Sequence, residues 1–416
     1  MLKLLAKKIF RKIKWKVGKA REYKHKVIRS LSQKKYRVVS FKQWCETNNS
    51  PLTIIKVEKN VTISQPVFFS STVYKAPFQT TQAELPDVYL ANIKNATVID
   101  GSDMVISDKN TVLYDEMALD PEGKHRPRMN IAQTVVSRNL NPARIGIVYK
   151  KTKLVLPSNS AIHFCKDYSA NYFHWLIEAL PRLSIVEQFP ELDAVPILVD
   201  HNLQSQQIES LRLINNNKRE IIQLQTGQAY HVENLYYPSG MSHLHNNYDH
   251  PVAYGKDIVI SPDAIHYLRK KILPLVDVKP AHRKLYISRK NMGAGKRMLN
   301  DDEIGTHFAA KGFEIVHPEK LNFIEQVKIF SEAEVIIGAG GAAFANMVFA
   351  PKACRVFALN ANNSRINYSL FSMMADFIGM KFAYVLGQDK SCNPTTQSHN
   401  DYVVDIKLIE SALNAS

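Results

Sequence analysis

The chain has 416 residues, 45% of them hydrophobic, and a net charge of +16. This composition excludes an intrinsically disordered protein, and the length is sufficient for two domains that each bury a core. The cysteines are scattered without a CxxC pair or a metal-ligand spacing, at Cys45, Cys165, Cys354 and Cys392. We therefore expect a reducing compartment and no disulfide framework.

The N-terminal segment carries most of the charge. Residues 1–40 hold fifteen Lys and Arg side chains against one acid, Glu22, which is +14 of the total +16. Apolar side chains recur there at a helical spacing, at Leu2, Leu5, Ile9, Ile13 and Val17. The pattern predicts a basic amphipathic helix that binds an anionic membrane surface, without an apolar run long enough for a signal peptide or a membrane span. A solvated arm and a nucleic-acid tail are the alternatives, and no RNA-binding motif supports the last.

Residues 50–160 contain short β-prone runs that are separated by turn residues. From about residue 160 the rhythm changes, since a helical run over 171–189 leads to a buried strand over 194–200, and a second helix and strand follow. This alternation predicts a parallel sheet with helical crossovers. We interpret the polar and aromatic residues 230–256 as a loop that faces a cleft.

A second alternating block begins near residue 260, with a helix that Ser261 caps and Pro262 begins. Strands and helices then alternate up to residue 387. Two such blocks predict an α/β fold with two Rossmann-like domains facing each other across a cleft, where ligands bind beyond the carboxyl ends of the strands. The predicted units are the basic segment 1–40, an N-terminal domain 41–258, a C-terminal domain 259–390 and a tail 391–416 that packs back on the N-terminal domain.

The run "EVIIGAGGAAFANMVF" joins a buried strand to a helix of small residues through a glycine-rich turn, at Gly338, Gly340, Gly341 and Ala342. Backbone N–H groups at such a turn and at a helix N-terminus form a cradle for phosphate. The pattern is not a full dinucleotide fingerprint, because residue 343 is alanine and the next strand offers Asn360 in place of an acid. It predicts phosphate or nucleotide binding, with tight strand–helix packing alone as the alternative.

The run "YISRKNMGAGKRMLND" brings four cations to the end of another strand and its loop, at Arg289, Lys290, Lys296 and Arg297. Guanidinium forks match phosphate oxygens in geometry and charge. These cations and the glycine turn, each at the end of a strand, predict a clamp for a diphosphate. A solvated basic loop is the alternative.

The run "NYFHWLIEALPRL" places His174, Glu178 and Arg182 on one helix face at a spacing of four. A histidine–carboxylate pair on a helix that faces a cleft is a candidate general base with its orienting partner. In the alternative, the histidine belongs to the core and the glutamate pairs with the arginine on a solvated face. The side chains that we place at the acceptor side or the cleft are Asn171, Arg182, His243 and His245.

No Asp-x-Asp motif occurs in the sequence, and no two histidines or cysteines have metal-ligand spacing on a helix. His243 and His245 of "SHLH" are close in sequence, but loop histidines of this kind usually hold no metal. We therefore expect no essential metal and no cofactor, so that cationic side chains would stabilise a leaving diphosphate.

In their order and spacing, the three runs resemble glycosyltransferase family 61, in its bacterial capsular-polysaccharide branch, over about residues 160–360. The resemblance implies a GT-B fold and an inverting hexosyl- or pentosyltransferase that moves a sugar from a nucleotide-sugar, commonly a UDP-sugar, to a growing capsule, O-antigen or lipopolysaccharide. The positions that match the family are His174 and Glu178 for catalysis, Arg289, Arg297 and Asn346 for the donor, and Glu319 and Gln326 before the glycine motif. Family members often have His-Gly-Ala where this chain has Gly340-Gly341-Ala342, so any donor contact of that histidine is missing.

The implied mechanism is a single displacement through an oxocarbenium-like state, with Glu178 or His174 as the base. Arg289, Arg297 and the backbone amides of 338–342 would stabilise the departing diphosphate. The implied acceptor is a lipid-linked glycan, so we expect a bacterial cytoplasmic enzyme at the inner face of the inner membrane, with no nucleic-acid partner. A nucleotide-dependent oxidoreductase and a non-catalytic nucleotide- or glycan-binding module are the rival functions.

Overall fold

The computed structural model describes residues 35–57, 60–71, 79–115, 135–137, 144–148, 150–154, 156, 158–226, 228–244, 252–290, 297–390 and 400–415. The predicted basic helix and the residues His245, Lys296 and Cys392 lie outside these ranges. The end of the basic segment, Lys35–Val39, forms strand β1.

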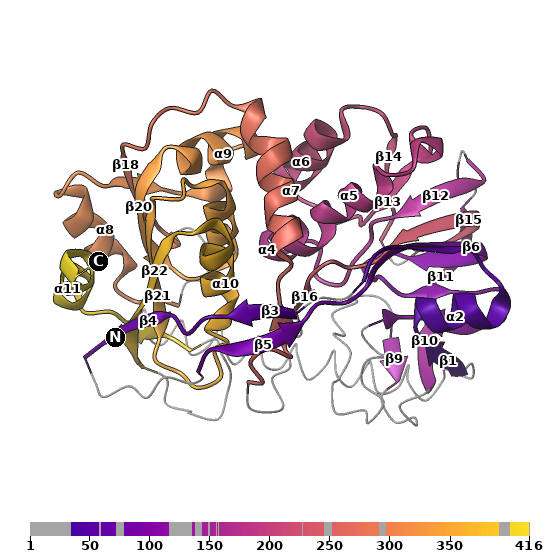
Figure 1. Cartoon of the computed structure of the whole chain (residues 1–416), viewed down its shortest axis with the longest axis horizontal. Coiled ribbons are helices and arrows are strands. Elements are labelled where there is room, and N and C mark those ends of the chain that lie inside the picture. Colours follow the sequence, from indigo (N-terminus) through magenta and orange to yellow (C-terminus); the bar gives the residue numbers. More distant parts are fainter. Residues whose placement is uncertain are drawn as a thin grey trace, which may run out of the picture.

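Two large sheets organise the described residues (Figure 1). The first, on the right of Figure 1, has the spatial order β14 (Ile221–Gln223), β13 (Ile197–Val199), β12 (Ser160–His163), β15 (Gln228–Pro238), β6 (Val88–Ile99), β7 (Val105–Ile106), β8 (Thr111–Leu113), β1, β10 (Arg144–Val148) and β9 (Val135–Ser137). In addition, β11 (Lys150–Leu154) pairs with β15, and β2 (Leu52–Lys56) pairs with β6.

The first sheet combines a parallel part with an antiparallel part. β12, β13 and β14 are parallel to one another, and β12 is also parallel to β15. The helix α6 (Ser205–Asn215) connects β13 to β14, as the alternation after residue 160 predicted. On its other side, β15 pairs with the antiparallel β6. The first sheet is therefore broader than a doubly wound sheet, and only its parallel part is Rossmann-like.

The interpretation of residues 230–256 as a loop was wrong for 230–238. These residues belong to β15, which pairs with β6 on one side and with β12 on the other. The run looked loop-like because polar residues interrupt it. Tyr230 and Tyr237 are nevertheless buried on the sheet, so cross-strand packing outweighs the polar composition.

The second sheet, on the left of Figure 1, is mainly parallel. Its spatial order is β19 (Glu314–Val316), β18 (Arg283–Ile287), β20 (Ala333–Ala339), β21 (Arg355–Ala361), β22 (Lys381–Asp389) and β23 (Tyr402–Val403). Its helices are α8 (Asp301–Ala309), α9 (Phe323–Ser331), the 3-10 helix η7 (Ala342–Phe349) and α10 (Ser369–Ile378). The strands and helices predicted for the second block are present, although the helix after the glycine turn is a 3-10 helix.

Segments from both ends of the chain complete the second sheet. Strand β4 (Val67–Ser70) pairs in parallel with β22 and lies in sequence between β3 (Asn60–Ile63) and β5 (Thr81–Glu84), which pair with each other. The C-terminal helix α11 (Ile406–Ala415) packs against β22 and β4. Helix α11 therefore packs on the second sheet, at a strand from the predicted C-terminal domain and at β4, which comes from the predicted N-terminal domain. Its apolar side chains, Ile409 and Ala412, are buried in the core of the second sheet.

A helical layer joins the two sheets (Figure 1). Helix α4 (Tyr172–His174) contacts η7, and α7 (Pro262–Ile272) contacts both η7 and α10. The ring of Phe371 lies 5.8 Å from Phe173 and 5.4 Å from Phe344, centroid to centroid. These rings belong to one apolar cluster that contains residues of both units, so the two units are packed together at this point.

Helix α7 begins where the sequence predicted. The Ser261 side chain accepts a hydrogen bond from the Ala264 N–H at 3.4 Å, and Pro262 is the first helical residue. The remaining short elements are α2 (Phe41–Asn48), η3 (Pro190–Leu192), β16 (His243–Leu244), β17 (Ile258–Val259), η4 (Leu273–Leu275) and η6 (Pro318–Lys320).

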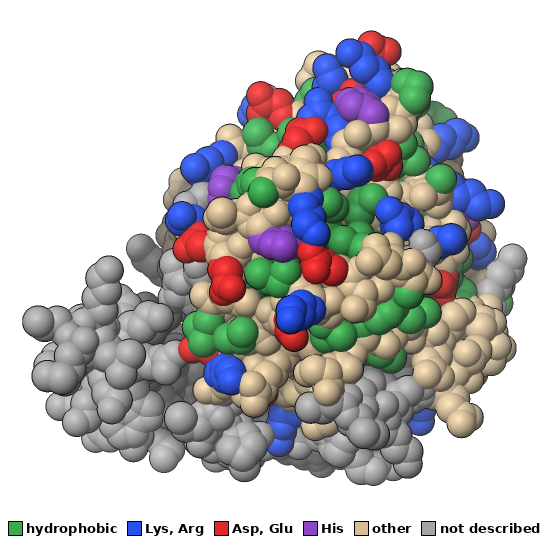
Figure 2. All heavy atoms as spheres, turned by 90° about the vertical axis from the view of Figure 1, so that its left-hand side faces the viewer, with side chains coloured by type: hydrophobic (Ala, Val, Ile, Leu, Met, Phe, Trp, Pro, Cys, Tyr) green, Lys and Arg blue, Asp and Glu red, His purple; other side chains and the backbone are tan. Residues whose placement is uncertain are grey.

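Figure 2 shows the face of the second unit that is turned away from the first. Lys and Arg side chains are interspersed there with Asp and Glu, so this face carries no field of a single sign. In the described ranges, no helix is both long enough and apolar enough to cross a membrane.

Candidate active site

One continuous helical segment carries the predicted histidine and glutamate. Its parts are α4, the π-helical turn η1 (Trp175–Ala179), the 3-10 turn η2 (Leu180–Arg182) and α5 (Leu183–Val186). The exposed Asn171 begins it, because its side chain accepts a hydrogen bond from the Phe173 N–H at 3.0 Å. Pro181 has no N–H for the Ile177 carbonyl and its ring would crowd that carbonyl, which accounts for the wider turn before it. Such π turns are frequent at functional sites.

His174 and Glu178 form a buried pair within this segment. His174 Nδ1 and Glu178 Oε2 are in hydrogen-bond contact, and the exposed fractions of the two residues are 5% and 1%. A carboxylate at Nδ1 fixes the orientation and the tautomer of the ring, which leaves Nε2 to accept a proton. The ring of Tyr168 lies 5.7 Å from that of His174. The structure therefore brings together the two residues that the sequence predicted as a base and its partner.

Two charged residues that sequence reasoning missed lie beside this pair. Lys166 Nζ is 3.6 Å from Glu178 Oε1 and 3.3 Å from Asp103 Oδ2. Lys166 and Asp103 are both more than nine-tenths buried. Lys166 follows β12 and Asp103 follows β6, so three distant segments assemble the cluster. A single lysine or aspartate in a loop forms no sequence pattern that would have identified it.

Asp200 holds the loop that carries Lys166. This carboxylate lies just after β13 and accepts hydrogen bonds from the Lys166 N–H at 3.0 Å and the Gly101 N–H at 2.7 Å. It also accepts a hydrogen bond from the Ser169 hydroxyl. Burial raises the pKa of Asp200 to about 6, although these hydrogen bonds oppose the rise. The loop between β12 and α4 is thus fixed at the carboxyl edge of the first sheet.

The structure directs Arg182 away from the pair. Its guanidinium lies 5.5 Å from the ring of Phe164 and 5.0 Å from that of Tyr237, and its Nε donates to the Pro238 carbonyl at 2.8 Å. Only 2% of Arg182 is exposed, so this conformation does not support the predicted acceptor contact. The π turn explains the difference, because it ends the regular spacing of four that would keep all three side chains on one face.

The glycine turn lies at the carboxyl end of β20, between side chains of two neighbouring strands. Arg289 follows β18, and its Nη1 donates to the Gly340 carbonyl at 3.1 Å. A Cβ built at Gly341 would lie 2.8 Å from Arg289 Cζ, and one at Gly340 would lie 2.9 Å from Asn360 Cγ on β21. The lack of side chains at the two glycines therefore allows the guanidinium and the amide to lie on the turn.

Electrostatics at this edge favour an anionic ligand with hydroxyl groups. Burial lowers the pKa of Arg289, while the charge of the exposed Glu319 acts in the opposite direction. The guanidinium stays charged in any case, and partial desolvation strengthens its attraction for phosphate. Asn360 Oδ1 is buried and accepts no hydrogen bond from the described residues. Asn360 also occupies the strand end where dinucleotide-binding folds carry an acid for ribose.

Asp301 fixes the strand end that carries Arg289. It is buried at the first position of α8 and accepts hydrogen bonds from the hydroxyls of Tyr286 and Ser288, each at 2.8 Å. The Arg289 N–H also donates to it, at 3.1 Å. The sequence analysis gave this aspartate no role, because its contacts with the preceding strand are not visible in a local pattern.

The other predicted phosphate contacts lie differently. Lys290 is exposed and forms an ion pair with Asp302 at 3.1 Å. Arg297 is half-buried, and its carbonyl accepts a hydrogen bond from the Tyr402 N–H. Among the predicted cations that the structure describes, Arg289 is the one with a hydrogen bond to the glycine turn.

Asn346 and Gln326, both predicted as donor contacts, form a buried link between helices. The Tyr172 hydroxyl donates to Asn346 Oδ1 at 2.7 Å, and Asn346 Nδ2 donates to Gln326 Oε1 at 2.7 Å. Gln326 Nε2 then donates to the Leu321 carbonyl at 3.1 Å. Burial raises the pKa of Tyr172, so its hydroxyl remains a donor. The link bonds the helix of His174 to η7, the helix that follows the glycine turn.

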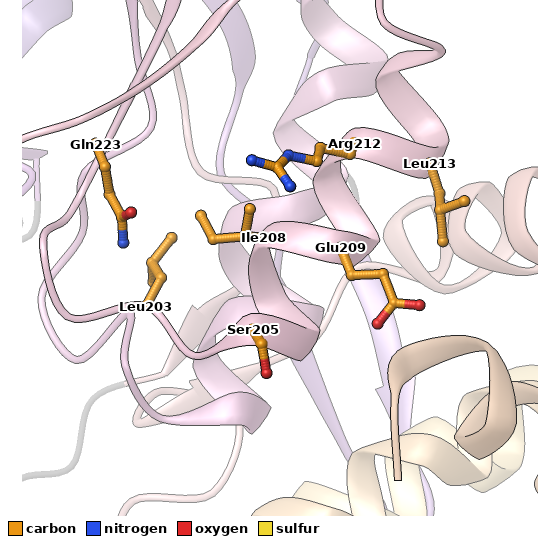
Figure 3. A pocket seen from close by; sticks show the side chains of 7 residues that line it. All are labelled: Leu203, Ser205, Ile208, Glu209, Arg212, Leu213 and Gln223. Carbon is orange, nitrogen blue, oxygen red and sulfur yellow. The ribbon is translucent and has the colours of Figure 1, made fainter.

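His243 and a surface pocket lie outside this constellation. His243 belongs to β16, which pairs with β17. A pocket of about 600 Å³ runs along α6 (Figure 3), lined by Leu203, Ser205, Ile208, Glu209, Arg212, Leu213 and Gln223. Glu209 of this lining accepts a hydrogen bond from the Phe323 N–H at 2.8 Å and so caps α9. None of the lining residues was predicted for the site. Across the described ranges, no three His, Cys, Asp or Glu side chains are grouped as metal ligands.

Comparison with known protein families agrees with this assembly of the site. The family model described as Glycosyltransferase 61 matches residues 172–357. The match begins in the helix of His174 and Glu178 and ends in β21, so it contains this pair, Arg289 and the glycine turn. No curated relative matches the chain. Residues 172–357 are therefore similar to glycosyltransferase family 61.

Proposed function

We propose that this protein is an inverting glycosyltransferase that moves a sugar from a nucleotide-sugar, preferably a UDP-sugar, to a glycan hydroxyl. One observation carries the proposal: a single family match contains both the buried His174–Glu178 pair and the glycine turn covered by Arg289. The pair supplies a base for an acceptor hydroxyl, and the turn supplies a site for an anionic leaving group.

In this proposal His174 is the base and Glu178 orients it. The Glu178 side chain has no exposed area, and each of its oxygens faces a partner, His174 on one side and Lys166 on the other. An acceptor hydroxyl can therefore approach the imidazole more readily than the carboxylate. His174 takes the hydroxyl proton as the oxygen attacks the anomeric carbon. The bond from that carbon to the diphosphate breaks, and the configuration inverts.

The donor would bind at the carboxyl edge of the second sheet. Arg289 uses one N–H for the Gly340 carbonyl, and a guanidinium has further N–H groups for phosphate oxygens. The backbone N–H groups after β20 add donors for the diphosphate. Asn360 Oδ1 lacks a hydrogen-bond donor among the described residues, and a ribose hydroxyl can supply one. Cations and amides thus stabilise the leaving group without a metal in this mechanism.

The proposal extends to the setting of the reaction. In this proposal the two packed sheet units form a GT-B arrangement, with the donor at the second unit and a lipid-linked glycan at the first. The basic composition of residues 1–40 supports a location at the inner face of a bacterial inner membrane, where anionic lipids attract it. The product would then be a capsule, O-antigen or lipopolysaccharide chain.

A thermal-shift panel of UDP, GDP, CMP, ADP and NAD, each with and without Mn²⁺, tests donor binding. A ligand that binds only the folded protein raises the stability by about 2.7 kcal/mol at a hundredfold excess over Kd. We expect a metal-independent shift by UDP that is lost in Arg289→Ala. Lys284→Ala is the matched control, because this exposed cation lies on the same strand at its amino end. A shift by NAD alone contradicts the proposal and favours an oxidoreductase.

Release of UDP from UDP-sugars in the presence of lipid-linked glycan then tests turnover. We expect His174→Ala to lower kcat by about 100-fold or more, within the range that general bases contribute. If the protein binds UDP but transfers no sugar, and Glu178→Gln binds UDP as the wild type does, the result would instead support the non-catalytic binding module.

A further inference from the structure

Lys166 is buried, and burial of a charged lysine costs free energy. Only 6% of it is exposed, and its ammonium lies 3.3 Å from Asp103 Oδ2 and 3.6 Å from Glu178 Oε1. An ammonium loses hydration when it is buried, so such a group is retained only with anionic partners. The transfer mechanism proposed above uses Glu178 but gives Lys166 no role. A buried cation in contact with a catalytic pair therefore requires an explanation.

The backbone holds Lys166 in place independently of its side chain. The Lys166 N–H donates to Asp200 Oδ2 at 3.0 Å, and the Ser169 hydroxyl donates to the same carboxylate. Both residues belong to the loop from β12 to α4, and Asp200 follows the neighbouring strand β13. The main chain that carries the ammonium is consequently anchored to the first sheet and not to the helix of Glu178.

The Glu178 carboxylate needs such an anchor because of its own geometry. The last torsion of a glutamate is broad, so a carboxylate bonded at one oxygen alone can rotate between several orientations. Glu178 Oε2 contacts His174 Nδ1, while Oε1 faces the ammonium. Two contacts on opposite oxygens allow a single orientation of the carboxylate plane.

We infer that Lys166 is a positioning residue for the base: its ammonium fixes the Glu178 carboxylate so that Oε2 holds the Nδ1–H of His174. Asp103 Oδ2 also contacts the ammonium, at 3.3 Å, and balances its charge. His174 then directs Nε2 at the acceptor hydroxyl in one tautomer. This inference rests on the proposed transferase function, but the arrangement of the ring can be measured separately from transfer.

Steady-state transfer kinetics of Lys166→Met and Lys166→Arg test the inference. Loss of positioning acts on the proton transfer, so Lys166→Met lowers kcat about 10- to 100-fold and changes the donor KM by less than about twofold. Lys166→Arg keeps the charge and restores kcat to within about fivefold of wild type. Arg219→Met is the matched control, because it removes another buried cation of the first unit, paired with Asp193 at 2.6 Å, and leaves kcat unchanged.

A second measurement reads the histidine directly. In protein with ¹⁵N-labelled histidine, the ring shifts of His174, assigned by their loss in His174→Gln, report which nitrogen carries the proton. The wild type shows the Nδ1–H tautomer, and Lys166→Met shows a mixture of tautomers. If Lys166→Met does not fold, the double variant Lys166→Met/Asp103→Asn replaces it, because it removes the ammonium together with the carboxylate charge that the ammonium balances.

Each outcome supports or overturns the inference. It is overturned by wild-type kcat and an unchanged tautomer in Lys166→Met, or by a loss of kcat in Lys166→Arg as large as in Lys166→Met. A loss of kcat in Arg219→Met as large as in Lys166→Met also overturns it. If the wild type transfers no sugar, the transferase proposal fails, and the tautomer of His174 alone decides the role of Lys166.

Discussion

Replacement of Gly341 by alanine is a sharp test of the donor site, because it adds one methyl group where the guanidinium of Arg289 lies. A Cβ built at Gly341 would be 2.8 Å from Arg289 Cζ and closer still to Nη1. Carbon atoms pack at about 3.5–4 Å, so the guanidinium has to move by about 1 Å. It can do so, because it is the end of a flexible side chain, and the fold is expected to remain intact.

The displacement has a calculable effect on nucleotide binding. A hydrogen bond to a charged group contributes about 1.5–3 kcal/mol, which corresponds to a change in Kd of about 10- to 150-fold. Gly341→Ala moves the guanidinium away from the turn and breaks its bond to the Gly340 carbonyl, now 3.1 Å long. We therefore expect the Kd for UDP to rise by this factor.

Isothermal titration with UDP measures the effect in Gly341→Ala, in Arg289→Ala and in the double variant. If the methyl group acts through the guanidinium, the double variant binds UDP no more weakly than Arg289→Ala alone. Such non-additivity is the signature of two groups that act on one contact. Gly240→Ala is the control for adding a methyl group, because the nearest atom to its Cβ would be the Ser242 carbonyl oxygen at 3.5 Å.

Two results would refute the reasoning. The first is an unchanged Kd in Gly341→Ala, since the donor diphosphate would then not depend on the guanidinium that lies on the turn. The second is full additivity in the double variant, which would mean that the methyl group blocks the ligand itself. In the second case the glycine contributes space for the nucleotide rather than for Arg289.

Three further predictions concern stability and membrane binding. Asn346→Ala lowers the free energy of unfolding, measured in urea, by about 3 kcal/mol, because Tyr172 and Gln326 lose their buried partner. Tyr172→Phe removes one hydrogen bond and lowers the same free energy by about 1 kcal/mol. Equal effects of the two variants would contradict the link. Burial raises the native pKa of Asp200 from 3.8 to about 6, so the native state binds this proton more tightly than the unfolded state does. As the pH falls from about 7 to about 4, the free energy of unfolding of the wild type therefore rises by about 2 kcal/mol relative to that of Asp200→Asn. A constant difference would argue against that pKa. Removal of residues 1–34 abolishes flotation with anionic vesicles and leaves the Kd for UDP within about twofold; retained flotation would disprove the membrane role.

Local sequence signals were sufficient for the strands from β18 to β22 and for the start of α7. Ser261 and Pro262 specify a helix start through a side-chain bond and a fixed backbone angle, and the structure has that start. The glycine turn and Arg289 were expected to meet because each follows a parallel strand, and parallel strands bring their carboxyl ends to one edge. These signals depend on neighbouring residues or on the rule that connects parallel strands, so they can be recognised in a single sequence without a structure.

The helix of His174 and Glu178 shows where a local pattern stops being reliable. The spacing of four between His174 and Glu178 gave the correct contact, because the two positions are one turn apart. The same spacing gave the wrong environment for Arg182, because the π turn before Pro181 changes the phase of the helix. A period derived from α-helices cannot follow such a change.

Contacts between distant segments were invisible to sequence reasoning for a different reason. Lys166 and Asp103 are 63 residues apart, and neither has a neighbour that marks it as part of an ionic cluster. Likewise, β4 adds to the second sheet although it lies near the start of the chain, because its pairing with β22 is decided by tertiary packing. Residues of this kind are found only when the backbone has been placed.

The bond from Tyr172 to Asn346 bears on how a transferase of this form would open. A two-domain transferase would separate its domains to exchange ligands, and here the helix of His174 is bonded to the helix that follows the glycine turn. Phe173 and Phe371 pack across the same contact, and exposing such a ring costs about 2 kcal/mol. Opening therefore costs the least free energy if the two units rotate about the α4–η7 contact and do not separate there. His174 and the donor edge would then keep their relative position throughout the cycle, and substrates would enter from the sides of the α4–η7 contact.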